Sequence, residues 1–436
     1  MPTTVGPNTF GEENLVFGYD LGDARNSYKG EPTTNFAYLH NGRKDSSYES
    51  YMPESGTGQI AGLHPGAIRV YNQNGTDISY YINTGINVGN SGVNWYDTHH
   101  AYWVYDEILK KPVVQMIDTN AVWQAKYMGL GVNWTDLGLT NGDQYTISWL
   151  QWSSDGVKRA QAGIYWYDTT AGYSNFWDGL SDTGTSTPGK WTRVSQTFTL
   201  SSGRSLDQGL SWYMYGMYFS RATLRIADVQ LEKKSHATPF TFSNVRSNTQ
   251  GLIDLKGNST IDLSNVSFDS NAQMTFDGTN DYVEIGGYFN YSNATLSMWI
   301  HPYSISDITI PVSKNTLSSP HLYGYIQYYS GQLRFYAPGN NLTVNWGSLS
   351  TNTWYHIVLT VDGAWHVAYK NGVQISSQAS SLGLFTGEYN VQLGRYGNGS
   401  PYIYNGLINS FQIYNRALTA SEVKANFNAV KSRFGI

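Results

Sequence analysis

Two aromatic-rich segments, residues 94–107 and 164–179, contain the side chains best suited to hold a ligand. Flat Trp and Tyr rings stand there beside His, Asp and Asn. Such groups suit a sugar, because rings stack on its C–H faces and planar polar groups pair with its hydroxyls. Alternate aromatic residues of a strand also fill sandwich cores, so a purely structural role stays open. The candidate glycan-binding residues are Trp95, Tyr96, His99, Tyr102, Trp166, Tyr173 and Trp177.

Catalysis has little support in the residue pattern. Glycoside hydrolases need two carboxyl groups, and no strand-like segment carries them at the spacing E-x-D-x-E or E-x-x-x-E. The chain also has no Cys nucleophile, no G-x-S-x-G and no phosphate loop. We therefore expect no enzymatic activity, and a polysaccharide-degrading enzyme is the weakest of the alternatives.

Composition restricts the partners of this chain of 436 residues, whose net charge is −5. No basic stripe is present, which disfavours nucleic acid and anionic membranes. No apolar run approaches the ~20 residues that span a bilayer, and the first residues do not resemble a signal peptide. Only 14% of the residues are charged while 15% are aromatic, a balance that suits protein interfaces. We expect synthesis in a cytoplasm and a homo-oligomer or a protein partner.

Short strand-like runs with Gly, Asn and Asp turns dominate from residue 65 to 243 and predict an all-β sandwich or jelly roll. Near the N-terminus, Leu15, Phe17 and Tyr19 alternate with smaller residues, which predicts a strand. One short helix is expected from residue 418, with a Thr or Ser N-cap and Glu422 in its first turn. Its apolar face would be Val423, Phe427 and Val430.

The C-terminal part carries FDGTNDYVEI (276–285), TNTWYHIVLTVDG (351–363) and LINSFQIYNRALTASEV (407–423). In order and content these phrases resemble the concanavalin-A-like/laminin-G-like family, which implies a β-sandwich and a binding role. Some relatives bind Ca²⁺, but Asn409 and Ser410 stand where the family usually has acids. The cluster Asp277, Asn280 and Asp281 is therefore predicted to form a tight turn.

The middle part resembles the carbohydrate-binding-module (galactose-binding-like) jelly rolls at WTRVSQTF (191–198), IADVQLE (226–232) and ATPF (237–240). This resemblance implies sugar binding without hydrolysis. It also implies a structural Ca²⁺ at Asp228, although only one acid stands where the family often has two and Ca²⁺ takes six to eight oxygens. The alternative is that Asp228 hydrogen-bonds a neighbouring loop.

The segment 15–30 resembles the first strand of bacteriophage laminin-G-like domains, and residues 253–258 resemble its continuation. The predicted fold is therefore all-β, with a jelly-roll β-sandwich inserted into a concanavalin-A-like β-sandwich and one short C-terminal helix. An independent anchoring strand is the alternative. The predicted divisions are an N-terminal arm (1–13), the first strand region (14–35), a linker (36–64), the jelly roll (65–243) and the C-terminal sandwich (247–436).

The combination of these two resemblances is typical of tailed-bacteriophage surface proteins. It implies a non-enzymatic virion accessory protein, either a capsid decoration or head fibre or a tail fibre, that aids adhesion to host-surface glycans. Its partners would be other virion proteins and further copies of itself, with a trimer expected for a fibre. It would be made in the host cytoplasm and lie on the virion surface. A bacterial surface adhesin is the alternative, which the missing export signal disfavours.

Overall fold

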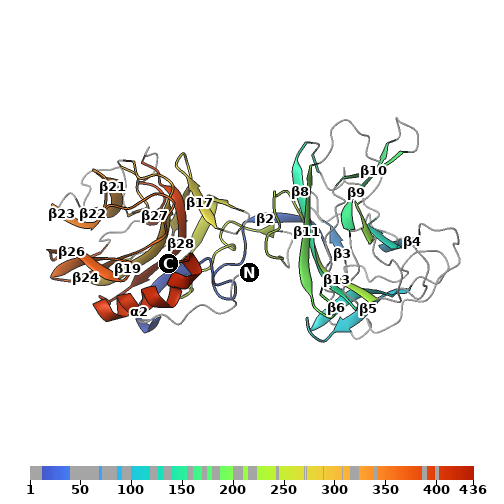
Figure 1. The fold of residues 1–436 in the computed structure, drawn as a ribbon, viewed down its shortest axis with the longest axis horizontal. Helices are drawn as coiled ribbons and strands as arrows, with labels where there is room; N and C mark the ends of the chain where they lie inside the picture. The colour runs from blue at the N-terminus through green and yellow to red at the C-terminus, as the bar shows by residue number, and fades with distance from the viewer. Residues whose placement is uncertain are drawn as a thin grey trace. The chain divides into compact units, whose positions relative to one another are not determined.

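The computed structural model divides the chain into two units, Met1–Pro32 with Arg246–Ile436, and Thr33–Val245 (Figure 1). Both units are built from β-sheets, and one short α-helix lies near the C-terminus, so the predicted fold class is confirmed. None of the described helices has the length and hydropathy that crossing a bilayer requires. The structure describes residues 12–39, 68–70, 86–90, 100–117, 126–130, 139–140, 142–154, 161–168, 174–178, 187–199, 210–214, 223–241, 245–269, 271, 273–287, 289–306, 308–314, 324–337, 341–384, 390–397 and 402–436.

The first unit is a sandwich of two antiparallel sheets. Its seven-stranded sheet has the order β15 (Ile261–Asn265), β18 (Tyr282–Ile285), β27 (Val391–Leu393), β20 (Val312–Ser313), β21 (Tyr325–Tyr329), β22 (Gln332–Ala337) and β23 (Leu342–Gly347). Its eight-stranded sheet has the order β16 (Ser267–Phe268), β17 (Met274–Asp277), β28 (Asn405–Tyr414), β19 (Asn293–Pro302), β24 (Tyr355–Asp362), β25 (Trp365–Lys370) and β26 (Val373–Ala379), and β1 (Leu15–Asp20) also pairs with β28.

The second unit also has two sheets. The five-stranded sheet has the order β10 (Ser174–Asp178), β9 (Gln161–Asp168), β12 (Leu210–Met214), β7 (Lys126–Leu130) and β4 (Ile86–Asn90). The other sheet contains β11 (Thr192–Thr199), β8 (Gln144–Ser153), β13 (Thr223–Glu232), β2 (Thr33–Leu39) and β14 (Val245–Arg246), with β3 (Ile68–Val70), β5 (His100–Asp106) and β6 (Lys111–Ile117) joined to it.

The N-terminal strand β1 belongs to the C-terminal sandwich. It runs antiparallel to β28, with Tyr19 opposite Phe411. Phe17 and Tyr19 are fully buried in the same core as Phe411 and Ile413. The alternation that predicted this strand therefore reflects one face turned toward the core. Two residues of the predicted arm, Glu12 and Glu13, lie in a short 3-10 helix, η1 (Glu12–Asn14), and the rest of the arm lies outside the described residues.

The chain leaves and re-enters the sandwich at adjacent positions. Tyr28 forms a β-bridge with Leu252, and the amide of Lys29 donates to the carbonyl of Gly251 at 2.8 Å. A Cβ atom at Gly251 would lie 2.5 Å from the carbonyl oxygen of Gly30, so only glycine fits this close approach. Such closely spaced ends are the geometry that tolerates an inserted unit.

Strand β2 differs from the sequence-based expectation. Residues 36–39 were predicted to begin a linker (36–64), but the strand Thr33–Leu39 pairs with β13 in the second unit. The side-chain oxygen of Asn35 accepts a hydrogen bond from the Leu231 amide at 3.0 Å, and Phe36 packs on Tyr145. Thr33 and Asn35, in the first half of this strand, are buried polar residues, so the strand as a whole shows no apolar alternation in the sequence.

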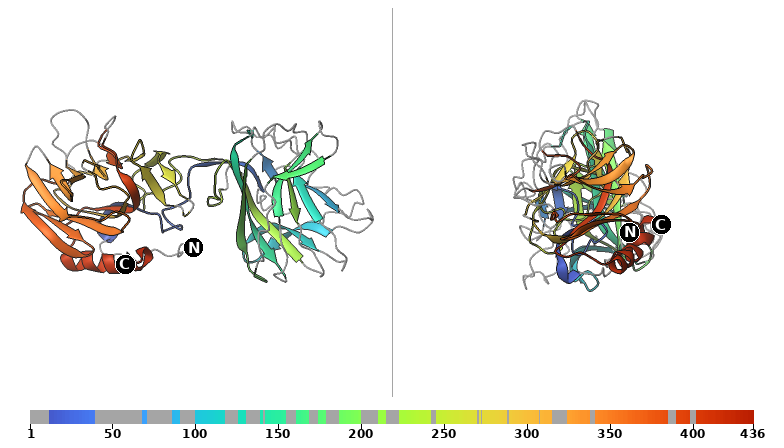
Figure 2. Two further views of the ribbon diagram at one scale, coloured as in Figure 1. Left: turned by 45° about the horizontal axis from the view of Figure 1, so that its top comes forward. Right: turned by 90° about the vertical axis from the view of Figure 1, so that its left-hand side faces the viewer.

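The predicted C-terminal helix is α2 (Ala420–Val430), and it lies along the outside of the sheet that contains β19 and β24 (Figures 1 and 2). Thr419 and Glu422 form a reciprocal capping box at its start. Val423 is fully buried, and the ring of Phe427 stacks on Trp299 with centroids 5.8 Å apart. In the 3-10 helix that follows, η5 (Lys431–Phe434), the ring of Phe434 also stacks on Trp299, with centroids 4.1 Å apart. The helix thus covers the outer face of this sheet.

Candidate ligand-binding face of the inserted unit

The predicted glycan-binding residues fall in two groups. Trp95, Tyr96, His99 and Tyr173 lie outside the described residues. Tyr102, Trp166 and Trp177 lie on β5, β9 and β10, where the backbone and its register are described.

The register of β9 and β10 separates two of these candidates. Trp166 is opposite Phe176, and Trp177 is opposite Tyr165. Directly opposed positions share a face, whereas neighbours along a strand alternate between faces. The positions of Trp166 and Trp177 are therefore on opposite faces of the five-stranded sheet, and one site cannot use both.

The two faces of this sheet differ sharply in residue type when the register is followed through all five strands. The face that includes the Trp166 position is apolar along the middle of its strands, with Ile86, Val88, Met128, Leu130, Ala162, Ile164, Phe176, Leu210 and Trp212. Its polar members, Asn90, Lys126, Asp168, Ser174 and Asp178, are all at strand ends. The opposite face combines aromatic, amide and glycine positions, with Asn87, Gly89, Tyr127, Gly129, Gln161, Gly163, Tyr165, Asn175, Trp177, Ser211 and Tyr213.

An antiparallel sheet in a sandwich buries its apolar face and leaves the polar one to solvent. We therefore take the face with Trp177 as the candidate ligand-binding face, because the residue types on the Trp166 face match the pattern of a core-facing side. Tyr127 and Tyr213 are directly opposed on the candidate face and were missed in the sequence analysis. The sequence does not relate these two residues, because their shared face follows only from the pairing of β7 with β12.

Tyr102 belongs to the other sheet of this unit. In this sheet Tyr102 is opposite Gln115, and Gln115 is opposite Arg225. Arg225 is in turn opposite Trp152, so the four residues form one row across the strands. The Arg225 guanidinium lies 4.7 Å from the centre of the Trp152 ring, and its Nη1 is 2.8 Å from Oδ2 of Asp106. The structure thus places Tyr102 in a row apart from Trp177.

Asp106 is a buried residue that anchors this row. Its Oδ1 accepts from the Trp191 indole at 3.2 Å and from the amides of Ile108 and Leu109. Burial alone would raise the pKa of Asp106, but the hydrogen bonds from Leu109, Arg225, Trp191 and Ile108 outweigh it and hold the pKa below its usual value. Asp106 therefore stays ionised and fixes the loop after β5.

Asp228, the predicted calcium ligand, has a positive φ of 50° at a bulge between β13 and β8. Its carboxylate forms an ion pair with Lys111, and its carbonyl accepts from Nη1 of Arg193 at 2.7 Å. A cation thus already faces the carboxylate. Among the described residues, no group of three His, Asp or Glu side chains is close enough to hold a metal ion. Structural calcium at Asp228, which the jelly-roll resemblance implies, is therefore a hypothesis that competes with this ion pair.

The cluster Asp277, Asn280 and Asp281 forms the tight turn that the sequence predicts. Oδ1 of Asp277 accepts from the amides of Thr279 at 2.7 Å and Asn280 at 3.2 Å. Oδ2 of Asp281 accepts from the amide of Asp277 at 3.1 Å, and Gly278 takes a φ of 78°. These carboxylates are used by the turn itself.

The comparison with protein families matches part of the sandwich. Residues 277–424 match the family model described as the concanavalin A-like lectin/glucanases superfamily. No curated protein matches the sequence.

Solved structures that resemble the chain include the binding domain of botulinum neurotoxin DC in complex with rat synaptotagmin II (16% identity, TM-score 0.35, 42% of this chain and 50% of that chain). Domain 4 of AbnA, an extracellular arabinanase from Geobacillus stearothermophilus, in complex with arabinotriose, is also similar (20% identity, TM-score 0.34, 41% and 92%). The chain spans about half the length of the toxin domain that it matches. With TM-scores below 0.5, these likenesses indicate neither a shared ligand nor a shared site.

Proposed function

We propose that this chain is a non-enzymatic glycan-binding accessory protein on the surface of a tailed-phage virion, made in the host cytoplasm, where it aids adhesion to host-surface glycans. It would serve as a capsid decoration or head fibre, or as part of a tail fibre. The observation that carries the binding role is the face of the five-stranded sheet with Trp177, Tyr165, Tyr127 and Tyr213.

This face has the features that sugar recognition requires. Aromatic positions lie beside amide positions, and glycines at 89, 129 and 163 alternate with them, so a sugar can approach the backbone between the rings. The superfamily match of the sandwich, residues 277–424, is compatible with a lectin-like role for the other unit as well.

The arrangement of acids on the sandwich supports a role without catalysis. Asp262 and Glu284 are opposed across β15 and β18, and a glycosidase needs such a carboxyl pair. However, the two carboxylate oxygens of Glu284 accept from the side-chain amides of Asn390 at 2.7 Å and Gln392 at 3.2 Å. Oδ1 of Asp262 accepts from the amide of Ser264 at 2.9 Å. Groups held as acceptors are poorly placed to give a proton to a departing sugar.

A single sugar site of this kind typically gives a free energy of about 4–6 kcal/mol, or a Kd from mM to tens of µM. Many copies on a particle would raise the effective affinity, since linked sites increase the local concentration. We therefore propose that the protein acts as an oligomer, a trimer if it is a fibre, bound to other virion proteins.

The test is a glycan array of host-envelope polysaccharides probed with the full chain, followed by calorimetry. Trp177→Ala should weaken binding at least tenfold, whereas Trp365→Ala, an exposed Trp of the sandwich, should not. Absence of any bound glycan, or unfolding caused by Trp177→Ala, would remove the support for this site. A labelled antibody viewed on the source particle by negative-stain microscopy tests the location; labelling of a bacterial surface instead would favour an adhesin.

A further inference from the structure

The outer face of the seven-stranded sheet in the sandwich carries a second candidate site. The inner face of this sheet supplies Ile326, Leu333, Phe335 and Val344 to the core. Because side chains alternate along each strand, Tyr325, Arg334 and Tyr336 lie on the other face, and all three are half-buried. Helix α2 packs on the outside of the opposite sheet, where Phe427 stacks on Trp299 and Val423 joins a cluster with Val358.

A continuous row of polar side chains crosses all seven strands of this face. Each member is directly opposite the next in the register, so neighbours are only about 4.5–5.5 Å apart at Cβ. The row is Asp262, Glu284, Gln392, Ser313, Tyr325, Tyr336 and Thr343. The middle members, Gln392 and Ser313, are buried, so the row has two separate half-buried parts. One part is acidic, and the other consists of phenols and hydroxyls.

Arg334 is held rigidly beside the tyrosine end. Its guanidinium lies 3.9 Å from the centre of the Tyr329 ring and 4.6 Å from that of Tyr336. With the Gln327 amide oriented to present its oxygen, Nε and Nη2 of Arg334 donate to it at 3.0 and 2.7 Å. A guanidinium has five N–H donors, so these two bonds leave three for another acceptor.

The charge of Arg334 lacks a counter-ion in the described part of the chain, where no carboxylate forms an ion pair with it. A planar guanidinium fixed between rings matches a carboxylate in geometry as well as charge. The rings around it are also fixed, since Tyr325 contacts Tyr336 and Tyr396 edge to face. Burial raises the pKa of Tyr325, so its phenol stays neutral and remains a hydrogen-bond donor.

We propose that this face binds an acidic oligosaccharide, with the sugar carboxylate on the free N–H groups of Arg334 and sugar hydroxyls on the phenols of Tyr325 and Tyr336. This site is separate from the Trp177 face and does not depend on it. A short acidic peptide, or a bare anion, is the competing occupant, and the rings favour the sugar because they offer apolar edges beside the charge.

Calorimetry of the full chain with a uronic-acid trisaccharide tests the proposal, and the methyl ester of the same trisaccharide is the neutral control. We expect the acid to bind and the ester to bind at least tenfold more weakly. Arg334→Gln should abolish this preference, and Arg334→Lys should reduce it several-fold because Lys keeps the charge but lacks the planar fork. Lys424→Gln, on the exposed side of α2, removes the same charge elsewhere and should leave binding unchanged.

Thermal unfolding establishes whether each variant is folded. If Arg334→Gln is not folded, Tyr336→Phe tests the same site by removing one phenol. Equal binding of acid and ester, unchanged binding by Arg334→Gln, or binding of sulfate or a glutamate peptide as tight as that of the trisaccharide would overturn the proposal. Trp177→Ala should leave this binding intact, so failure of the jelly-roll site and failure of this site give different results.

Discussion

Phe17 in β1 pairs with Ile413 in β28, although the whole inserted unit, Thr33–Val245, separates them in the sequence. Phe17 is fully buried, and its ring contacts Phe289 and Phe411 at centroid distances of 5.4 and 6.0 Å. The first strand is therefore an integral part of the sandwich core, and the sandwich is made from both ends of the chain.

Replacing Thr33–Val245 by a short Gly/Ser linker should leave a folded sandwich, because Lys29 and Gly251 are already hydrogen-bonded at the junction. Phe17→Ala in this shortened protein should lower the free energy of unfolding by about 3–5 kcal/mol, as truncation of other large buried side chains does. Chemical denaturation of both proteins measures this. A shortened protein that fails to fold while the full chain is folded would contradict the independence of the sandwich.

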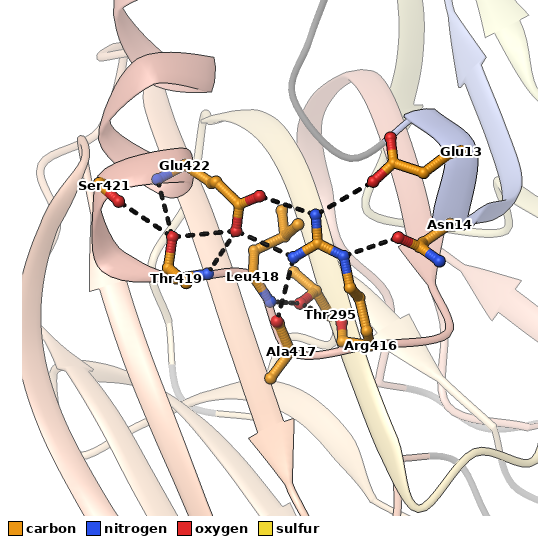
Figure 3. A network of polar contacts seen from close by, with 9 residues as sticks. All are labelled: Glu13, Asn14, Thr295, Arg416, Ala417, Leu418, Thr419, Ser421 and Glu422. Atoms are coloured by element: carbon orange, nitrogen blue, oxygen red, sulfur yellow. Dashed lines mark hydrogen bonds and ion pairs between the residues drawn. The ribbon is translucent and has the colours of Figure 1, made fainter.

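A polar network joins the helix to the N-terminal segment (Figure 3). Arg416 donates from Nη2 and Nη1 to the two oxygens of Glu422 at 2.7 and 2.9 Å, and from Nε to the side chain of Asn14 at 2.7 Å. The bond from Arg416, together with Thr419 at the helix start, lowers the pKa of Glu422 to about 2.

Glu422→Gln should destabilise the sandwich by about 1 kcal/mol at pH 7, because it loses the ion pair and weakens the cap. A carboxyl with a lowered folded-state pKa stabilises above its unfolded value of ~4.3 and loses that effect as pH falls toward 2. The difference between wild type and variant should therefore shrink over that window in denaturation at several pH values. Glu13→Gln, at an exposed partner 3.4 Å from Arg416, should have a smaller effect.

Two buried histidines make the sandwich sensitive to acid. Burial lowers the pKa of His356 to about 3 and that of His366 to about 4. His366 stacks on Phe335 in the core, and neither of its ring nitrogens has a hydrogen-bond partner among the described residues. Each histidine stabilises as the neutral form above the unfolded value of ~6.5. That stability is lost as pH falls from 6.5 toward 4 for His366 and toward 3 for His356.

Between pH 6.5 and 4 the wild-type sandwich should lose free energy of unfolding, and His366→Leu should reduce that loss by about 1–3 kcal/mol. Each unit by which the pKa is shifted corresponds to about 1.4 kcal/mol. Urea denaturation at pH 7.5, 5.5 and 4 gives the comparison. His236→Gln, in the inserted unit, is the control and should leave the pH dependence of the sandwich unchanged. Equal pH dependence in His366→Leu and wild type would show that this histidine is not the source.

Lys111, rather than calcium, is expected to neutralise Asp228. Asp228→Asn should cost about 1–3 kcal/mol because it leaves the Lys111 ammonium without its partner. Added Ca²⁺ and EDTA should leave the Tm of the inserted unit unchanged. A Tm that falls with EDTA and recovers with Ca²⁺ would instead establish the metal site that the jelly-roll resemblance implies.

Trp166 and Trp177 should respond differently to truncation because their positions are on opposite faces of the five-stranded sheet. We expect Trp166→Ala to destabilise the inserted unit by about 3–5 kcal/mol, the cost of emptying a core position. Trp177→Ala should cost less than about 1 kcal/mol, as for a surface position. Thermal unfolding of both variants measures these costs. A larger loss of stability in Trp177→Ala than in Trp166→Ala would show that the face with Trp177 is the buried one.

Locally encoded features were predictable from the sequence. The helix α2 begins where Thr419 and Glu422 form a capping box, because both residues of that signal lie within one turn. The turn at Asp277–Asp281 follows from Asp and Gly at fixed offsets. The N-terminal strand was predicted from the alternation of Leu15, Phe17 and Tyr19, with its partner suggested by resemblance alone.

Features that depend on pairing between distant strands were not predictable. Arg334 and Tyr336 alternate visibly in β22, but only the register with β21 places Gln327 and Tyr325 beside them. The aromatic segment 164–179 was treated as one site, whereas the hairpin register divides Trp166 from Trp177. Sequence periodicity gives two faces for each strand and does not say which faces of different strands coincide.

The placement of β28 after the inserted unit and after the other strands of the sandwich sets an order for folding on the ribosome. β28 lies between β17 and β19 and also pairs with β1, so these three strands wait for it. The inserted unit is complete once Val245 has emerged, but β28 ends only at Tyr414, which takes roughly 10–35 s more at typical synthesis rates of ~5–20 residues per second. Once β19 has emerged within that interval, its edge toward β28 is unpaired, which is the kind of surface that aggregates or recruits chaperones. A nascent chain that stalls before Asn405 would therefore carry a finished jelly roll tethered to an unclosed sandwich.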